Sequence, residues 1–224
     1  MVLLAGYTSY MTSAASGILL HHPDGQTFRF DAGALCLELL VTGGEGAFSR
    51  FEVLHSPDDL VAWLPQSRLG ADGWNFPDRI EVTDDELAGL KRLRAHLWEV
   101  ALDLTSGRAP GQADLDAINR AAAGAPLVPQ LDPDGGRGWA APVTGARVTA
   151  TMARDAVTLL GGPGVSRLRR CAGDNCALMF ADTSRPGRRR WCAMERCGNR
   201  DKVRAYRDRR QHRPDDPSPS GAGR

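Results

Sequence analysis

Four cysteines near the C-terminal end constrain the fold of this chain more than any other feature. Four residues separate Cys171 from Cys176, fifteen residues follow, and four residues again separate Cys192 from Cys197. Two close pairs joined by an insert of hairpin length can bring four thiolates into a tetrahedron at low entropic cost, and zinc binds such a tetrahedron. Because sulfur fills all four positions, we expect one structural Zn²⁺ per chain, with no open position for catalysis.

The residues around the cysteines predict the fold of the metal-binding segment. Residues 178–180 and 189–191 have the composition of two short strands on either side of a turn. Gly198 directly follows the last cysteine, where a positive φ would turn backbone N–H groups toward sulfur. Asn199 then stands at an N-cap position before a predicted helix over residues 200–210. We therefore expect a treble-clef-like zinc finger, stabilised by its metal because so short a segment buries little apolar surface.

The charge of the chain is divided unevenly along the sequence. Residues 1–166 contain 12 Lys and Arg against 20 Asp and Glu, whereas residues 167–213 contain 15 Lys and Arg against 5 Asp and Glu. The net charge of +1 therefore hides an acidic body and a strongly basic C-terminal segment. Such asymmetry indicates a polyanionic partner, most often nucleic acid, although the alternative is a basic segment that docks on the acidic body of its own chain.

Arginine dominates the basic segment and is grouped on the predicted hairpin and on the predicted helix. Arginine suits the forked recognition of phosphate oxygens and of guanine edges in a major groove. On the helix, Val203 and Tyr206 are three residues apart and are predicted to face the zinc core, which leaves a basic stripe outside. The predicted nucleic-acid contacts are Arg185, Arg188, Arg189 and Arg190 on the hairpin and Arg200, Lys202, Arg204 and Arg207 on the helix.

The larger N-terminal part has the pattern of a mainly helical α+β domain with small β-hairpins. Apolar residues recur at three- and four-residue steps, and Ser56, Thr83 and Asp114 stand at predicted N-cap positions. We predict helices over residues 57–64, 84–106, 114–123 and 147–160. We predict hairpins over residues 18–30 and around residues 134–136, while residues 34–41 form a buried element that periodicity alone does not assign to helix or strand.

No arrangement of residues in the body predicts catalysis. The acidic groups at residues 58–59 and 84–86 lie in the first turns of predicted helices, where capping and the helix dipole explain them. Cys36 lies far from the other cysteines in an apolar run, so we expect it to be a small buried core residue. No apolar run approaches the roughly 20 residues of a membrane helix, and the N-terminus lacks the charged start of a signal peptide. We therefore expect a cytoplasmic protein that is not an enzyme and does not bind a membrane.

Several motifs resemble known bacterial families. The segment Cys197-Gly-Asn-Arg200, preceded by Trp191-Cys192 and by Phe-Ala-Asp-Thr-Ser-Arg at residues 180–185, resembles the CGNR zinc finger. Residues 30–38 and 60–64 resemble the ABATE domain that habitually precedes this finger. The resemblance implies a stress-induced transcription regulator that binds DNA through the finger.

Gly161-Gly-Pro-Gly164 marks the expected domain boundary, and residues 1–17 stand before the region that resembles the family. Residues 38–42 read Glu-Leu-Leu-Val-Thr where relatives tend to carry Asp-Phe-Val-Asn-Thr, so any role of that asparagine is missing here. The expected parts are an N-terminal extension (1–17), an ABATE-like α+β domain (18–164), a CGNR-type zinc finger (165–213) and a disordered tail rich in Pro and Ser (214–224).

Two other functions fit the same sequence. An RNA- or ribosome-associated zinc protein would use the same arginines, because they suit both nucleic acids. A zinc-stabilised protein-interaction module would bind its partner with little dependence on salt. The sequence leaves open whether the chain forms a homodimer and whether the body binds a small-molecule effector.

Overall fold

The computed structural model describes residues 17–22, 24–133, 135–185 and 187–211. The predicted tail, and the predicted N-terminal extension apart from Gly17, lie outside the described residues. The helices are α1 (Leu35–Leu39), α2 (Pro57–Trp63), α3 (Asp84–Thr105), α4 (Gln112–Ala122), α5 (Gly145–Gly161) and α6 (Asn199–Gln211). The strands are β1 (Ile18–His21), β2 (Thr27–Phe30), β3 (Trp74–Asn75), β4 (Ile80–Glu81), β5 (Pro129–Leu131), β6 (Arg137–Trp139), β7 (Val143–Thr144), β8 (Leu168–Arg170) and β9 (Met179–Ala181). The mainly helical α+β fold predicted from the sequence is confirmed.

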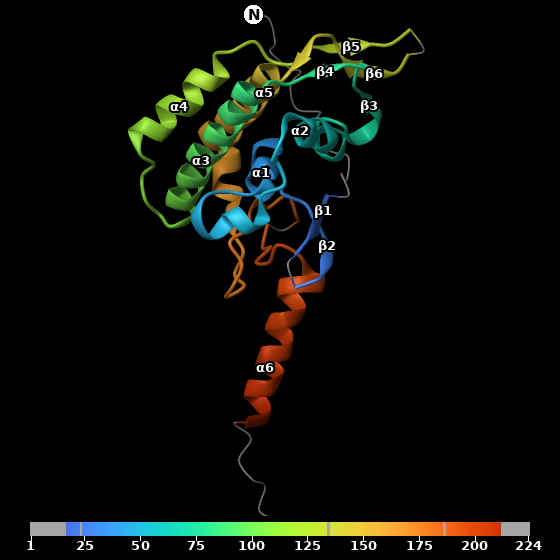
Figure 1. Cartoon of the computed structure of the whole chain (residues 1–224). Coiled ribbons are helices and arrows are strands. Elements are labelled where there is room, and N and C mark those ends of the chain that lie inside the picture. Colours follow the sequence, from blue (N-terminus) through green and yellow to red (C-terminus); the bar gives the residue numbers. More distant parts are fainter. Residues whose placement is uncertain (1–16, 23, 134, 186, 212–224) are drawn as a thin grey trace, which may run out of the picture.

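Three helices that contact one another form the centre of the body. α3, α4 and α5 pack together, and the short α1 lies against α5 (Figure 1). The buried face of α3 is made by Leu87, Leu90, Leu93, Leu97 and Val100, which recur at three- and four-residue steps and therefore point the same way. Burial of this apolar face drives the packing of the helices.

Two helices of the body begin as the sequence predicts. Ser56 caps α2 and Thr83 caps α3, each within a capping box that satisfies backbone N–H groups left without partners in the first turn. The prediction that Asp114 caps the next helix is wrong. α4 has no side-chain cap, and Asp114 lies in its first turn, with a carboxylate oxygen 2.7 Å from a ring nitrogen of His96.

The strands of the described residues form four small sheets. β1 and β2 form the first predicted hairpin, and β5 and β6 form the second. β3 pairs in parallel with β6, and β4 pairs in parallel with β7. β9 pairs with β8, so the predicted hairpin between residues 178–180 and 189–191 is wrong. The second of these segments forms no strand; the N–H of Ala172 donates to the carbonyl oxygen of Arg190 at 2.8 Å, and side-chain contacts of Arg189, described below, also hold it.

The C-terminal module and the body share one hydrophobic core. Leu168 and Phe180 belong to the same buried cluster as the body, and β8 and β9 contact α3 and α1. The N–H of Ala181 donates to the carbonyl oxygen of Ala32 at 2.9 Å. Gly33 permits this close approach, because it has a φ of +78° and a Cβ at this position would collide with the carbonyl oxygen of Ala181. The predicted domain boundary at residues 164–165 stays a prediction.

α6 has a different relation to the rest of the molecule. It begins at the cysteine module, next to the β1–β2 hairpin, and runs away from the body (Figure 1). None of the helices in the described part of the chain is long and apolar enough to cross a membrane.

Candidate metal centre and nucleic-acid interface

Short elements at one end of the core bring the four cysteines together. Cys171 follows β8, Cys176 lies in the turn before β9, and Cys192 and Cys197 lie in the loop and in the π-helical turn (Met194–Gly198) that lead into α6. All four Sγ atoms lie within 4.8 Å of one another. The Sγ of Cys192 is 3.7 Å from that of Cys176 and 3.5 Å from that of Cys197. Sulfurs bound to zinc at about 2.3 Å in a tetrahedron are about 3.8 Å apart, so the cluster fits one structural zinc ion.

The electrostatics of the cluster also fit a bound cation. Hydrogen bonds from Cys176 and Cys192 lower the pKa of Cys171. The contact with Cys171 in turn raises the pKa of Cys176 and of Cys192, while burial raises the pKa of Cys197. Neighbouring thiols can stabilise one thiolate, but four thiolates in contact need a positive ion between them. The backbone supports this site, because the N–H of Cys192 donates to the Sγ of Cys171 at 3.2 Å.

Gly198 and Asn199 have roles that differ from those predicted. Gly198 has no positive φ; it lies inside the π-helical turn, where a Cβ would be only 2.7 Å from the Sδ of Met194. Asn199 has the helical angles φ −70° and ψ −37°, so it does not cap α6. The N-cap position falls earlier, at Ala193, because the π-helical turn runs directly into α6. The helix is therefore continuous with the residues that hold the metal.

Comparisons with known proteins agree with this geometry. The family model CGNR zinc finger matches residues 167–210. The family model ABATE, described as "Putative stress-induced transcription regulator", matches residues 33–163, which is more than half of the chain. The chain belongs to the ABATE family. Both resemblances seen in the sequence are thereby confirmed. The search of curated proteins finds no match to the chain.

Arg189 was predicted to contact nucleic acid, but in this ABATE protein it lies where the zinc finger packs against the body, a boundary here called the seam. Its guanidinium lies 4.0 Å from the ring centre of Phe180 and donates to the carbonyl oxygen of Asp31 at 2.8 Å. It also donates to the carbonyl oxygens of Trp191, at 2.9 Å, and Cys192. Burial lowers the pKa of Arg189, whose charge these carbonyl oxygens compensate. Arg189 therefore joins the finger to the body, and we leave it out of the proposed contact surface.

The remaining arginines of the loop at residues 183–190 are exposed: Arg185, Arg188 and Arg190. A buried carboxylate shapes this loop. Asp182, 1% exposed, accepts hydrogen bonds from the N–H and hydroxyl of Ser184 and from the N–H of Arg189. Burial pushes the pKa of Asp182 up, but these hydrogen bonds outweigh burial and lower the pKa. Asp182 thus stays ionised and holds the loop that carries the three arginines.

The predicted contacts on α6 are also exposed: Arg200, Lys202, Arg204 and Arg207. Two of them pair with acidic side chains. Arg200 donates to Asp24 of the β1–β2 turn at 2.8 Å, whereas Arg204 donates to Asp201 at 2.7 Å and pairs with Asp174 beside the cysteines. Among the described residues, Arg200 thus docks on an acidic side chain of the body, as that alternative expects, whereas both acidic partners of Arg204 belong to the finger itself.

The prediction that Val203 and Tyr206 face the zinc core is wrong. Their side chains are 48% and 54% exposed. The reason is the direction of α6: because the helix runs away from the body, no core made of described residues lies beside its middle turns (Figure 1). The interior next to the cysteines is filled by Phe180 and Met179 of β9 instead.

The β1–β2 hairpin fixes the base of α6, and sequence reasoning missed these contacts. The guanidinium of Arg196, 5% exposed, lies 4.9 Å from the ring centre of Phe28 and donates to Gln26 at 3.1 Å. The N–H of Arg29 donates to the carboxylate of Glu195 at 3.0 Å. The only signal for Arg196 in the sequence was its place between two cysteine ligands, among many other arginines. These contacts hold α6 in a fixed direction relative to the body.

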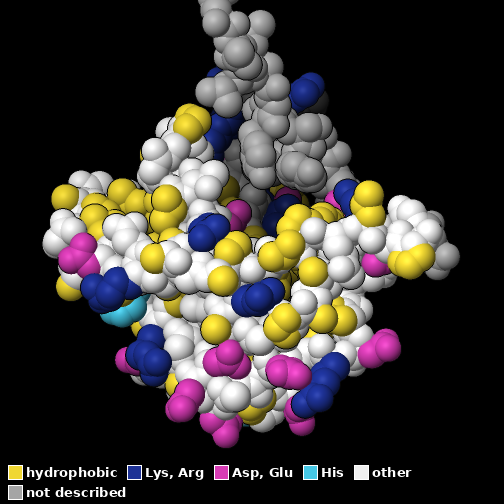
Figure 2. Space-filling view, turned by 90° about the horizontal axis from the view of Figure 1, so that it is seen from above, with side chains coloured by type: hydrophobic (Ala, Val, Ile, Leu, Met, Phe, Trp, Pro, Cys, Tyr) yellow, Lys and Arg dark blue, Asp and Glu magenta, His cyan; other side chains and the backbone are white. Residues whose placement is uncertain are grey.

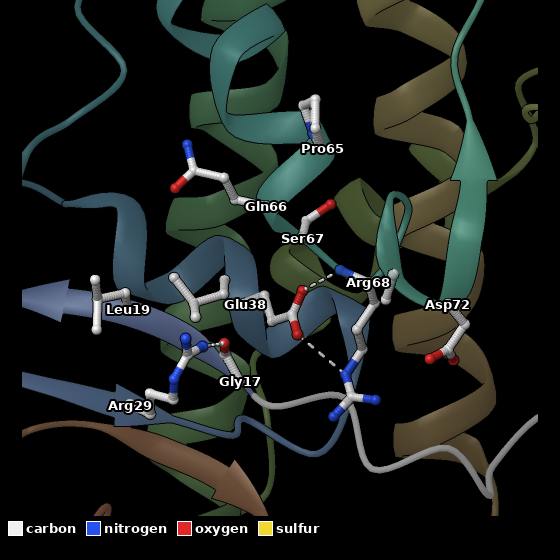
Figure 3. Close-up of a pocket in the computed structure, with 11 residues that line it drawn as sticks. Gly17, Leu19, Arg29, Glu38, Pro65, Gln66, Ser67, Arg68 and Asp72 are labelled. Atoms are coloured by element: carbon white, nitrogen blue, oxygen red, sulfur yellow. Dashed lines mark hydrogen bonds and ion pairs between the residues drawn. The ribbon is translucent and has the colours of Figure 1, made fainter.

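A polar pocket of about 340 Å³ lies in the body beside the same hairpin (Figure 3). Its wall includes Leu19 and Arg29 of the hairpin, Glu38 of α1 and Arg68. Glu38 is 2% exposed and accepts a hydrogen bond from the N–H of Arg68 at 2.8 Å, with the Nε of Arg68 at 3.1 Å. Burial raises the pKa of Glu38 to about 7. Sequence reasoning missed this pocket, because Glu38 stands in an otherwise apolar run.

Figure 2 shows the end of the body away from α6, where residues drawn in grey cover part of the surface. On the face in Figure 2, acidic and basic side chains are interspersed with apolar ones, and neither sign of charge dominates. The exposed arginines of the loop and of α6 are therefore the basic group that we consider for a polyanionic partner.

Proposed function

We propose that this ABATE protein is a transcription regulator that binds duplex DNA through α6 and the loop at residues 183–190. The family description supports regulation. One observation carries the proposal of DNA binding: a helix with six Lys or Arg, fixed at its base by the metal-binding turn, stands clear of the body (Figure 1). A basic helix that projects from a rigid support suits insertion into a groove of DNA.

The acidic partners of α6 do not oppose this proposal. The pairs of Arg200 with Asp24 and of Arg204 with Asp201 join exposed or half-buried side chains. Exposed ion pairs of this kind contribute about 0–1 kcal/mol. Phosphate groups can replace them, because a bidentate arginine–phosphate contact is at least as favourable and releases counterions from the DNA.

The test is a titration of duplex DNA with the full-length, zinc-loaded chain, followed by fluorescence anisotropy at several salt concentrations. We expect the logarithm of the binding constant to fall linearly with the logarithm of salt, with a slope near −0.9 for each phosphate contacted. Replacing Arg185, Arg188 and Arg190 by Ala should reduce the slope by about 2 to 3. The control is Arg92→Ala with Arg120→Ala, two exposed arginines of α3 and α4, which should leave slope and affinity unchanged.

The same titration separates the two alternatives. An RNA- or ribosome-associated protein would prefer structured RNA to duplex DNA at every salt concentration. A protein-interaction module would bind neither nucleic acid with a steep salt slope. Either result would contradict the proposal.

The proposal also covers where and when the protein acts. A regulator of this kind would work in the bacterial cytoplasm, next to the chromosome, and it needs no catalytic step. The stress response named in the family description predicts that deletion of the gene changes transcript levels mainly under stress, which RNA sequencing of stressed and unstressed cells would measure. Equal changes in both conditions would contradict this part.

A further inference from the structure

The positions of charges around α6 divide its surface into four faces. Residues three, four or seven apart share a face of an α-helix, so the sequence of α6 can be sorted directly. The first face, here called the reading face, consists of Asn199, Val203, Tyr206 and Arg210. The two flanks consist of Arg200, Arg204 and Arg207 on one side and of Lys202 and Arg209 on the other. The acidic face consists of Asp201 and Asp208.

The order of these faces around the helix is informative. At 100° per residue, the reading face lies between the two basic flanks, and the acidic face lies opposite the reading face. The four residues of the reading face are exposed, and the guanidinium of Arg210 lies 5.8 Å from the ring centre of Tyr206. A central strip of mixed polar and apolar groups is thus bordered by positive charge on both sides.

We propose that α6 lies in the major groove of B-form DNA with its reading face toward the base edges. This inference rests on the proposed function and adds to it the groove and the residues that read sequence. A helix with side chains is about 10–12 Å wide, and the major groove is about 12 Å wide. The two basic flanks then face the phosphates of the two strands, and the acidic face points out of the groove.

The chemistry of the reading face suits base edges. Asparagine can bind adenine, and arginine can bind guanine, through two hydrogen bonds each, whereas apolar side chains contact the methyl group of thymine. Asn199 and Arg210 supply the first two kinds of group, and Val203 supplies the third. The 13 residues of α6 span about 20 Å, which is enough to cross several base pairs.

Two other occupants fit this surface less well. The four-three-four spacing of the reading face is also the spacing of a coiled-coil seam. A second copy of α6, however, would bring its own basic flanks against these, and like charges repel across such a seam. A double-stranded RNA offers a deep and narrow major groove that a helix does not enter. The arrangement therefore favours B-form DNA.

The experiment compares two neighbouring arginines that lie on different faces. Duplexes are first selected from a random pool with the full-length, zinc-loaded chain. The ratio of affinities for the selected duplex and a scrambled duplex is then measured for Arg210→Ala, on the reading face, and for Arg209→Ala, on a flank. Both changes remove one positive charge from the last turns of an exposed helix, so each serves as the control for the other.

We expect Arg210→Ala to reduce the affinity ratio about 5- to 150-fold, the range for loss of a bidentate base contact. Arg209→Ala should weaken binding to both duplexes alike and reduce the salt slope by about 0.9, leaving the ratio unchanged. Methylation of guanine N7, which lies in the major groove, should interfere with binding at guanines of the selected site.

Three results would overturn the inference. Equal changes of the ratio in the two variants, or binding that N7 methylation does not affect, would remove the reading face and leave DNA binding itself in place. Failure of the unaltered protein to bind any duplex would remove both the inference and the proposed function.

Discussion

At the scale of single residues, buried ionisable side chains fix how the parts of the molecule meet. The guanidinium of Arg189, in the finger, donates to the backbone of the body at Asp31. The carboxylate of Asp182 accepts hydrogen bonds from the loop that leads to Arg189. Glu38 has a comparable role inside the body, where it holds Arg68, while Asp31 binds the other side of the same guanidinium. Each of these charges is tolerated because hydrogen bonds replace the water that burial removes.

Glu38 leads to a prediction about pH. Burial raises its pKa from 4.5 to about 7 in the folded protein, so the folded state binds this proton more tightly than the unfolded state. The resulting contribution to stability is present below about pH 4.5 and is lost as pH rises through about 7, an effect of about 3 kcal/mol. Glu38→Gln should flatten the dependence of the free energy of unfolding on pH over this window. Urea denaturation at pH 5, 6, 7 and 8 measures it for both proteins.

The comparison between the two proteins isolates Glu38 from the other groups that titrate in this range. Arg68, Asp31 and Asp155 also face Glu38 and are unchanged in the variant. Parallel pH profiles for the two proteins would contradict the raised pKa.

At the scale of elements, the predicted N-caps Ser56 and Thr83 were correct, whereas Asp114 and Asn199 do not cap their helices. Both predicted hairpins of the body formed, but the one predicted in the finger did not. The capping boxes at Ser56 and Thr83 and the periodicity of α3 depend on residues within one or two turns, so the sequence predicts them well. The partner of β9 depends on a segment on the other side of Cys171, and no local pattern encodes it. α1 is the intermediate case, because all five of its residues are buried and carry no periodicity.

The cap of α3 gives a prediction at this scale. Thr83→Ala removes the side chain that accepts from the N–H of Glu86, and we expect it to lower the free energy of unfolding by about 1 kcal/mol. Urea denaturation measures the loss. Thr158→Ala is a suitable control, because Thr158 is exposed and its hydroxyl bonds only within α5, to the carbonyl oxygen of Arg154. A loss no larger at Thr83 than at Thr158 would contradict the role of the cap.

At the scale of the whole molecule, the metal centre supports more than the finger. The cysteines lie at the end of a core that runs without interruption from the body into β8 and β9. The seam is closed by the hydrogen bond from Ala181 to Ala32 and by Arg189. Loss of the metal should therefore weaken the contacts of α1 and α3 with the finger.

We predict that Cys192→Ser abolishes stoichiometric zinc binding and lowers the thermal stability of the body as well as that of the finger. The lost ligand leaves three thiols that hold zinc poorly, and metal binding contributes on the order of 10 kcal/mol to folding of such modules. Elemental analysis measures the metal, and hydrogen exchange of the amides of α1 and α3 measures the body. Chelation of the unaltered protein should give the same exchange pattern, and added zinc should reverse it. Unchanged exchange in the body would show that finger and body are independent.

The sequence by itself determined the four zinc ligands, the predicted helices of the body, the N-caps Ser56 and Thr83 and the two hairpins of the body, because each depends on residues close together in the chain. Tertiary structure decided that α1 is a helix, since a carboxylate of α5, that of Asp155, accepts from the N–H of Cys36 at 2.8 Å. It also decided that Arg189 contacts the body and that Val203 and Tyr206 are exposed. These outcomes depend on contacts between residues far apart in the sequence, and the local spacing of residues does not predict such contacts.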